Sequence, residues 1–171
     1  FDTVKRKVLL LARVYLYDPL KKKYDFDTVA RQKKEAPMPI DKTNKTQSDF
    51  LNQICGDVEP FLFLLDMLPD TAAYLKDRKG RIMFLNQWNY ANCNVKSVSE
   101  AIGKTSYDLF PESCAQDYVD TDDWVMRTGR PIIKEVSVSP DLTTKFMCYS
   151  KTPLYGKGRK VVGVAAVYHF I

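Results

Sequence analysis

The C-terminal part of the chain restricts the possible folds most strongly, because it consists of three strand-like runs separated by short turns. The runs, residues 132–138, 145–151 and 160–170, are rich in β-branched and aromatic residues. Turn-forming residues separate them, Pro140-Asp141 in the first case and Gly156-Lys157-Gly158 in the second. This pattern predicts three antiparallel strands joined by hairpins.

A further strand pair and several helices precede these strands. Residues 72–76 and 81–85 flank the turn 77–80 and predict a β-hairpin. Capping residues and glycine stops predict helices over 86–93, from Ser97 to Gly103, and from Pro111 or Ser113 to Thr128. This order of elements is typical of an α+β fold in which a five-stranded antiparallel sheet carries helices on one face.

The segment before the first hairpin predicts two leading helices. Thr46 and Asp49 form a Thr-x-x-Asp helix start, and Gly56 ends that helix. Asp57 is the expected cap of the second helix, which has Pro60 in its first turn and a broad apolar face. Such a face requires burial against another part of the protein.

Charge divides the chain at Gln47. Residues 1–46 contain 12 Lys and Arg against 6 Asp and Glu, whereas residues 47–171 contain 14 against 15. We therefore predict a basic N-terminal arm over 1–46, with one helix and a linker, and a near-neutral domain over 47–171. The expected helix of the arm has an apolar stripe of Val4, Val8, Leu11 and Tyr15.

The basic arm has two possible roles. Its apolar stripe can pack on the domain or on a second copy, or its lysines can contact the phosphates of nucleic acid. We favour the first role, because the stripe requires burial, and do not predict direct nucleic-acid contact.

The sequence also restricts the cellular setting. Its longest apolar runs are far shorter than a membrane span, and Phe1 in place of Met indicates a segment of a longer chain rather than a secretory precursor. The four cysteines, Cys55, Cys93, Cys114 and Cys148, lack metal-binding spacing. We expect reduced thiols and a cytoplasmic location.

Five ordered motifs resemble those of a PAS domain, in particular the sensor modules of bacterial transcription regulators and signalling kinases. The resemblance covers roughly residues 60–171. The motifs are 74–86 (YLKDRKGRIMFLN), 102–111 (IGKTSYDLFP), 127–131 (RTGRP), 151–154 (KTPL) and 161–164 (VVGV).

The resemblance implies a small ligand or cofactor held in a cup between the sheet and its helices, with occupancy passed to an attached output domain. Because side chains alternate across a sheet, the strand candidates for this cup depend on register. They are Met83 and Leu85 on the second strand, and either Met147 and Tyr149 or Phe146 and Cys148 on the fourth.

Helices and loops supply the other candidates for the cup. Trp124 is the candidate on the long helix and Asn89 on the short helix after the second strand. Polar groups are expected from Asn89, Ser106, Ser150 and Lys151, although Lys151 is equally able to pair with Asp108 or Glu135.

The cofactor stays unknown from the sequence, but two kinds are disfavoured. Flavin-binding relatives carry a Gly-Arg-Asn-Cys motif, whereas residues 103–106 read Gly-Lys-Thr-Ser, so Ser106 stands where the reactive thiol would be. Cys93, in Asn92-Cys93-Asn94, is interpreted as an ordinary thiol. Haem-binding relatives use a histidine on the long helix, and the single histidine is His169, which we expect on the solvent side of a strand.

Neither a metal site nor an enzyme is predicted. The acidic group Asp117, Asp120, Asp122 and Asp123 is interpreted as the solvated front of a helix. No nucleophile–histidine constellation or phosphate-binding loop is present in the sequence.

The expected function is a ligand-binding sensor that dimerises through flanking helices. The alternative is a ligand-free interaction or dimerisation module with a filled core.

Overall fold

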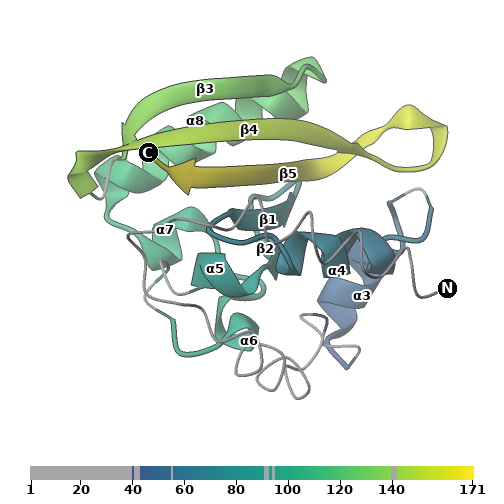
Figure 1. Cartoon of the computed structure of the whole chain (residues 1–171). Helices are drawn as coiled ribbons and strands as arrows, with labels where there is room; N and C mark the ends of the chain where they lie inside the picture. Colours follow the sequence, from purple (N-terminus) through teal and green to yellow (C-terminus); the bar gives the residue numbers. More distant parts are fainter. Residues whose placement is uncertain (1–39, 41–42, 55, 91–92, 94, 140–141) are drawn as a thin grey trace, which may run out of the picture. The chain divides into compact units, whose positions relative to one another are not determined.

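The computed structural model describes residues 40, 43–54, 56–90, 93, 95–139 and 142–171. Its centre is a five-stranded antiparallel sheet with strand order β2-β1-β5-β4-β3 (Figure 1). The strands are β1 Ala72–Asp77, β2 Ile82–Leu85, β3 Ile132–Ser139, β4 Leu142–Tyr155 and β5 Val161–Phe170. The predicted α+β architecture is confirmed, and β4 is longer at both ends than expected.

Helices α5 to α8 lie between β2 and β3 in the chain and cover one face of the sheet. They are α5 Gln87–Tyr90, α6 Val98–Ala101, α7 Ser106–Leu109 and α8 Glu112–Thr128. As predicted, Ser97 caps α6 and Gly129 ends α8 in the left-handed conformation, with φ 65°. The sequence interpretation missed α7, which a capping box between Thr105 and Asp108 starts.

The two leading helices, α3 Lys45–Leu51 and α4 Glu59–Asp66, pack on the opposite face of the sheet. Asn44 caps α3, rather than Thr46, because its side chain accepts a hydrogen bond from the backbone N–H of Gln47. Phe50 and Leu51 of α3 and Leu62 and Leu65 of α4 form one core cluster with the apolar residues of β1 and β2. The sheet is therefore covered on both faces around β1.

A β-bulge at Met83 changes the side-chain pattern of β2. Leu75 pairs with Phe84 and Lys76 with Ile82, so Met83 is the extra residue between them. The buried amide of Gln47 donates a 2.7 Å hydrogen bond to the Met83 carbonyl. Helix α3 thus satisfies a backbone group near the irregularity in the sheet.

Some sequence expectations concern residues outside the described part. These are the helix and most of the linker in the N-terminal arm, Cys55 and the turn at Pro140-Asp141. Within the described residues, none of the helices is sufficiently long and apolar to cross a membrane.

Candidate functional site

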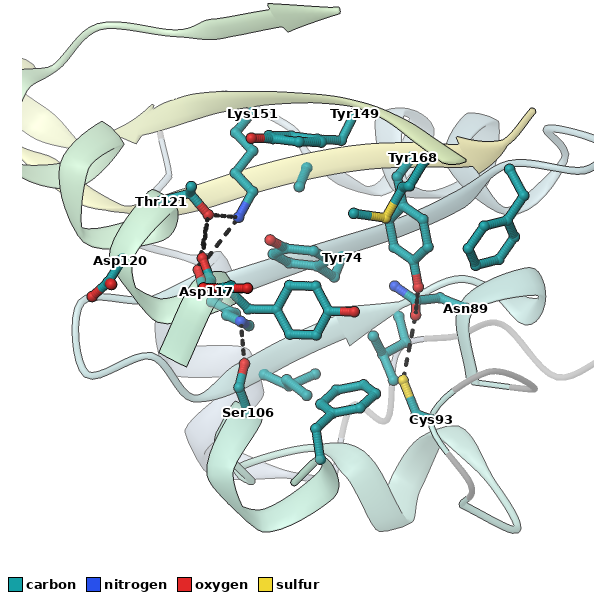
Figure 2. A pocket seen from close by; sticks show the side chains of 18 residues that line it. Tyr74, Asn89, Cys93, Ser106, Asp117, Asp120, Thr121, Tyr149, Lys151 and Tyr168 are labelled. Carbon is teal, nitrogen blue, oxygen red and sulfur yellow. Dashed lines mark hydrogen bonds between the residues drawn. The ribbon is translucent and has the colours of Figure 1, made fainter. Parts of the chain in front are cut away.

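A cavity of about 260 Å³ lies between the sheet and the helices α5, α7 and α8 (Figure 2). Each strand except β3 contributes to it, and α8 closes one side. Its walls are mostly apolar and aromatic. Buried polar groups gather at two places, and the exposed carboxylates of Asp117 and Asp120 on α8 also line the cavity. The lining residues are Tyr74, Lys76, Ile82, Leu85, Asn89, Cys93, Ser106, Phe110, Asp117, Tyr118, Asp120, Thr121, Met147, Tyr149, Lys151, Ala166, Tyr168 and Phe170.

The first polar group is a buried charge cluster centred on Asp122 of α8, directly behind the cavity wall. Its carboxylate accepts 2.6 Å hydrogen bonds from the ammonium groups of Lys76 and Lys151 and a 2.7 Å hydrogen bond from the Tyr74 hydroxyl. All three charged side chains are at most 5% exposed. Two cations share one anion, so the cluster carries a net positive charge beside the cavity.

Hydroxyl groups and aromatic rings complete the surroundings of the two ammonium groups. Lys76 donates to the Ser106 hydroxyl at 2.8 Å, and Lys151 donates to the Thr121 hydroxyl at 2.7 Å (Figure 2). The Lys76 nitrogen also lies 4.7 Å from the centre of the Tyr74 ring, where a cation–π interaction is favourable. The cluster is therefore fixed by strands β1 and β4 and by helices α7 and α8.

The protonation states in this cluster follow from burial and charge. Burial raises the pKa of Asp122, but the ion pairs with Lys76 and Lys151 more than offset this and hold that pKa below its ordinary value. Burial lowers the pKa of Lys151, and its attraction to Asp122 compensates only in part. Burial, followed by the nearby charge of Asp122, raises the pKa of Tyr74 well above 10.

The second polar group lies at the α5 side of the cavity. Tyr168 of β5 donates a 2.8 Å hydrogen bond to the Asn89 side-chain oxygen, which also accepts a 3.3 Å bond from the Cys93 thiol (Figure 2). The Asn89 amide in turn donates to the Ala73 carbonyl. Asn89 therefore joins β1, β5 and the segment after α5 at one edge of the cavity.

The comparison with protein families agrees with this geometry. A family model described as PAS fold matches residues 65–171. The chain belongs to the PAS fold family.

Solved structures with the same fold include three of VqmA proteins. The chain resembles VqmA of Vibrio cholerae, solved as a dimer in the absence of target DNA, with 22% identity and a TM-score of 0.53; the match covers 66% of this chain and 50% of that one. The structure of VqmA bound to DPO has 21% identity and a TM-score of 0.54, and the match covers 66% of this chain and 57% of that one. A phage VqmA–DPO complex has 19% identity and a TM-score of 0.51, and the match covers 66% of this chain and 52% of that one.

These similarities concern the fold, and the match spans only about half the length of each VqmA chain. No curated protein matches the sequence.

Most of the residues that the sequence analysis selected for the PAS cup line the cavity. They are Leu85, Asn89, Ser106, Met147, Tyr149 and Lys151. On β4 the register is the first of the two alternatives, because Met147, Tyr149 and Lys151 point into the cavity, whereas Phe146 and Cys148 do not line it.

Three selected residues lie elsewhere, and one of them is Ser150, which does not line the cavity. Met83 is fully buried, but it belongs to the core between the sheet and the leading helices, because the bulge leaves Ile82 and Leu85 on the cavity face. Trp124 is 37% exposed and does not line the cavity. It is two residues from the inward-facing Asp122, about 200° around the helix, and so lies on the outer side of α8.

Two interpretations of charged residues were wrong. Asp122 is buried, although the sequence analysis placed all four aspartates of α8 on a solvated surface. Lys151 pairs with this carboxylate, rather than with Asp108 or Glu135. Asp108 instead accepts hydrogen bonds from the backbone and side chain of Thr105. His169 is exposed on β5, as expected.

The sequence analysis also missed several cavity residues of the PAS domain, among them Tyr74, Lys76, Thr121 and Tyr168. One signal for Lys76 was present: a lysine inside the otherwise apolar strand 72–76 requires a buried partner. Within the part of the chain that the structure describes, no group of three or more His, Cys, Asp or Glu side chains is arranged to hold a metal ion.

Proposed function

We propose that this PAS domain is a sensor that binds a small organic molecule in the cavity between the sheet and α8. The observation that carries the proposal is the combination of an apolar cavity with a buried cluster of net positive charge at its wall. A core that only needed filling would not require two buried ammonium groups, because burying unmatched charge is costly. A bound ligand offers such charge a partner.

The cavity favours a ligand of particular chemistry. Aromatic rings of Tyr74, Tyr149 and Tyr168 suit a flat, mostly apolar molecule. The Lys151 ammonium already donates to three acceptors, whereas Lys76 donates to two, Ser106 and Asp122. The third N–H of Lys76 favours a hydrogen-bond acceptor at one end of that molecule. The proposed ligand is therefore a small aromatic or heteroaromatic compound with one such polar group.

The solved VqmA structures support this proposal by example. Two of them are complexes with DPO, and the part of each chain that matches, about half of its length, has the fold of the present chain. DPO is accordingly the first compound to test, alongside a panel of small aromatic metabolites.

We further propose that occupancy is relayed through β5 to an output region for transcription regulation or two-component signalling. Phe170 lines the cavity, and the next residue, Ile171, is bonded through its backbone to Phe146 of β4. A ligand that contacts Phe170 can change the position of this strand end. It can do so only by binding one arrangement more tightly than the other.

The ligand proposal is tested by native mass spectrometry of the protein purified from cells and by thermal unfolding with DPO and the compound panel. A ligand at about 100 times its Kd stabilises the protein by about 2.7 kcal/mol and raises Tm by about 5–10 °C. Ala166→Leu, which fills the cavity from β5 without removing a polar group, should abolish this rise. The exposed Trp88→Ala serves as the control and should retain it.

The sensor proposal is contradicted by a specific pair of results. The first is that no small molecule co-purifies with the protein. The second is that no compound changes Tm, either in the parent protein or in Ala166→Leu.

A second candidate function, self-association, rests on a separate observation. Helix α4 buries Leu62 and Leu65, but three of its large apolar side chains and that of its C-cap residue are about half exposed: Phe61, Phe63, Leu64 and Met67. A helix face of this kind fits a second copy of the same helix in a dimer. VqmA of Vibrio cholerae, which has the same fold, is solved as a dimer. Sedimentation over a range of concentrations should show a dimer; a monomer throughout would exclude this candidate.

A further inference from the structure

The near-neutral charge of residues 47–171 conceals a strong separation of charge. Three segments, 77–81, 123–130 and 157–160, together hold eight of the fourteen Lys and Arg residues of this domain and two of its fifteen Asp and Glu residues. The rest of the domain is correspondingly acidic.

The sheet topology places all three segments at one end of the molecule. Segment 77–81 forms the turn between β1 and β2, and 157–160 forms the turn between β4 and β5. Because Asp77 pairs with Gly163, these two turns are neighbours. Figure 1 shows the β4–β5 turn at the end of the sheet opposite the C-terminus.

Direct contacts join the turns to the end of α8. The Arg78 guanidinium donates a 2.9 Å hydrogen bond to the Val161 carbonyl. The Tyr155 hydroxyl donates to the Gly129 carbonyl at 3.0 Å, which connects the end of β4 to the end of α8. Arg78, Arg127 and Lys160, one from each segment, line the same surface groove. The three segments therefore form one surface, which we call the basic end.

The positive charge of the basic end is largely uncompensated. Asp77 is buried and already accepts hydrogen bonds from Arg81 and from the backbone of the turn. Asp123 is the one exposed carboxylate within the three segments. Against it stand seven exposed cations, because the half-buried Arg81 is paired with Asp77. A surface of this kind attracts a polyanion.

The chemistry of the basic end favours nucleic acid over an acidic protein. Exposed ion pairs contribute only about 0–1 kcal/mol each, so a protein partner requires apolar anchors as well. Within the three segments, no large apolar side chain is exposed except Trp124, which is 37% exposed. Binding to a phosphate backbone, in contrast, is driven by the release of counterions and requires only a high density of cations.

We propose that the basic end binds the phosphate backbone of double-stranded DNA without sequence preference. The cations come from two turns and from the end of α8, so several phosphates along one duplex can be contacted at once. This surface differs from the N-terminal arm, and it lies outside the ligand cavity. The proposal is therefore independent of the sensor function, and either can fail without the other.

The test uses the full chain and a 16-bp duplex of arbitrary sequence, with affinity measured at several salt concentrations. In the test variant, four exposed cations of the basic end are neutralised: Lys79→Gln, Arg127→Gln, Lys157→Gln and Lys160→Gln. The matched control neutralises four cations of the arm: Lys21→Gln, Lys22→Gln, Lys23→Gln and Lys33→Gln. Thermal unfolding confirms that both variants are folded.

For the parent chain we expect a Kd on the order of 10⁻⁴–10⁻⁶ M at physiological salt. The test variant should bind at least about tenfold more weakly, and its log–log salt slope should be shallower by about 3–4. The control should change less on both measures. Equal affinity of the test variant and the parent would overturn the proposal.

A residue-level readout accompanies the affinity measurement. In the ¹⁵N-labelled chain, the duplex should shift the amide signals of Gly80, Gly129 and Gly158, one glycine from each of the three segments. The amides of Tyr168 and Phe170, at the opposite end of β5, should not shift. Tighter binding of poly-glutamate than of DNA at the same three glycines would instead assign the basic end to an acidic protein and overturn the DNA proposal.

Discussion

At the scale of single residues, Asp122 is the most consequential group in the structure. It is the only carboxylate bonded to Lys76 and Lys151 among the ion pairs of the described residues, and it is buried with both. Buried charges of this kind add little stability compared with apolar residues, but removing one partner is expensive. The cluster is therefore sensitive to which of its members is lost.

The first prediction contrasts two substitutions in this cluster. Asp122→Asn leaves two buried ammonium groups without a counter-charge and should destabilise the fold by about 3–5 kcal/mol. Lys76→Met leaves the neutral pair of Asp122 and Lys151 and should cost only about 1 kcal/mol. Urea unfolding of both variants at pH 7 measures the difference. Equal losses of stability would show that the net charge of the cluster does not matter.

The second prediction concerns alkaline pH. Burial raises the pKa of Tyr74 well above 10, and burial followed by the charge of Glu135 raises the pKa of Tyr149 to about 12. Above pH 10 the unfolded chain loses these protons, whereas the folded chain retains them, so the free energy of unfolding should fall as pH rises from 10 to 12.

Urea unfolding between pH 9 and 11.5 measures this dependence. Tyr74→Phe and Tyr149→Phe should each make the fall less steep than in the parent. Tyr107→Phe, at an exposed tyrosine, is the control. The prediction fails if all three variants have the same slope as the parent.

At the scale of elements, the packing of α3 against the sheet depends on a close approach at Gly163. A methyl group at this position would lie against the Lys76 carbonyl oxygen and within 3.1 Å of the Phe50 ring. Gly163 therefore allows β1, β5 and α3 to meet at one point. Neither the strand pattern nor the helix pattern alone required a glycine there.

The third prediction follows from this contact. Gly163→Ala should destabilise the fold by about 3 kcal/mol, the upper part of the range for overpacking, because the obstacle is backbone. Gly80→Ala is the control: it has open space but a φ of 72°, and should cost about 1 kcal/mol. Thermal unfolding of both variants measures the difference. A loss for Gly163→Ala no larger than that for Gly80→Ala would contradict the close approach.

Element-level patterns also show where sequence interpretation succeeds and fails. The α8 helix was predictable from its start near Pro111, its stop at Gly129 and its charged termini, all of which are local signals. The bulge at Met83 was not, since it depends on pairing with β1. One extra residue in β2 was enough to exchange Met83 for Ile82 on the cavity face.

At the scale of the whole molecule, the separate surfaces lead to separate behaviours. The exposed face of α4 and the basic end involve different elements, and the cavity lies between the sheet and α5, α7 and α8. A change at one surface should therefore leave the other two functions intact.

The fourth prediction belongs to this scale. Leu64→Glu, on the exposed face of α4, should prevent self-association and remove any dependence of Tm on protein concentration. Glu59→Lys, on the same helix but outside the apolar group, is the control and should behave like the parent. Sedimentation and thermal unfolding at two concentrations measure both effects. A dimer that survives Leu64→Glu would place the interface elsewhere.

The sequence by itself determined the five strands and most of the helices, because these depend on local periodicity, caps and turns; the PAS family was indicated by the resemblance of its motifs. Only the tertiary structure decided which residues face the cavity, that Asp122 is buried between two lysines, and that eight cations gather at one end. These properties depend on strand register, helix rotation and the meeting of distant turns. A count of charges along the chain gives their sum, whereas the fold alone gives their positions.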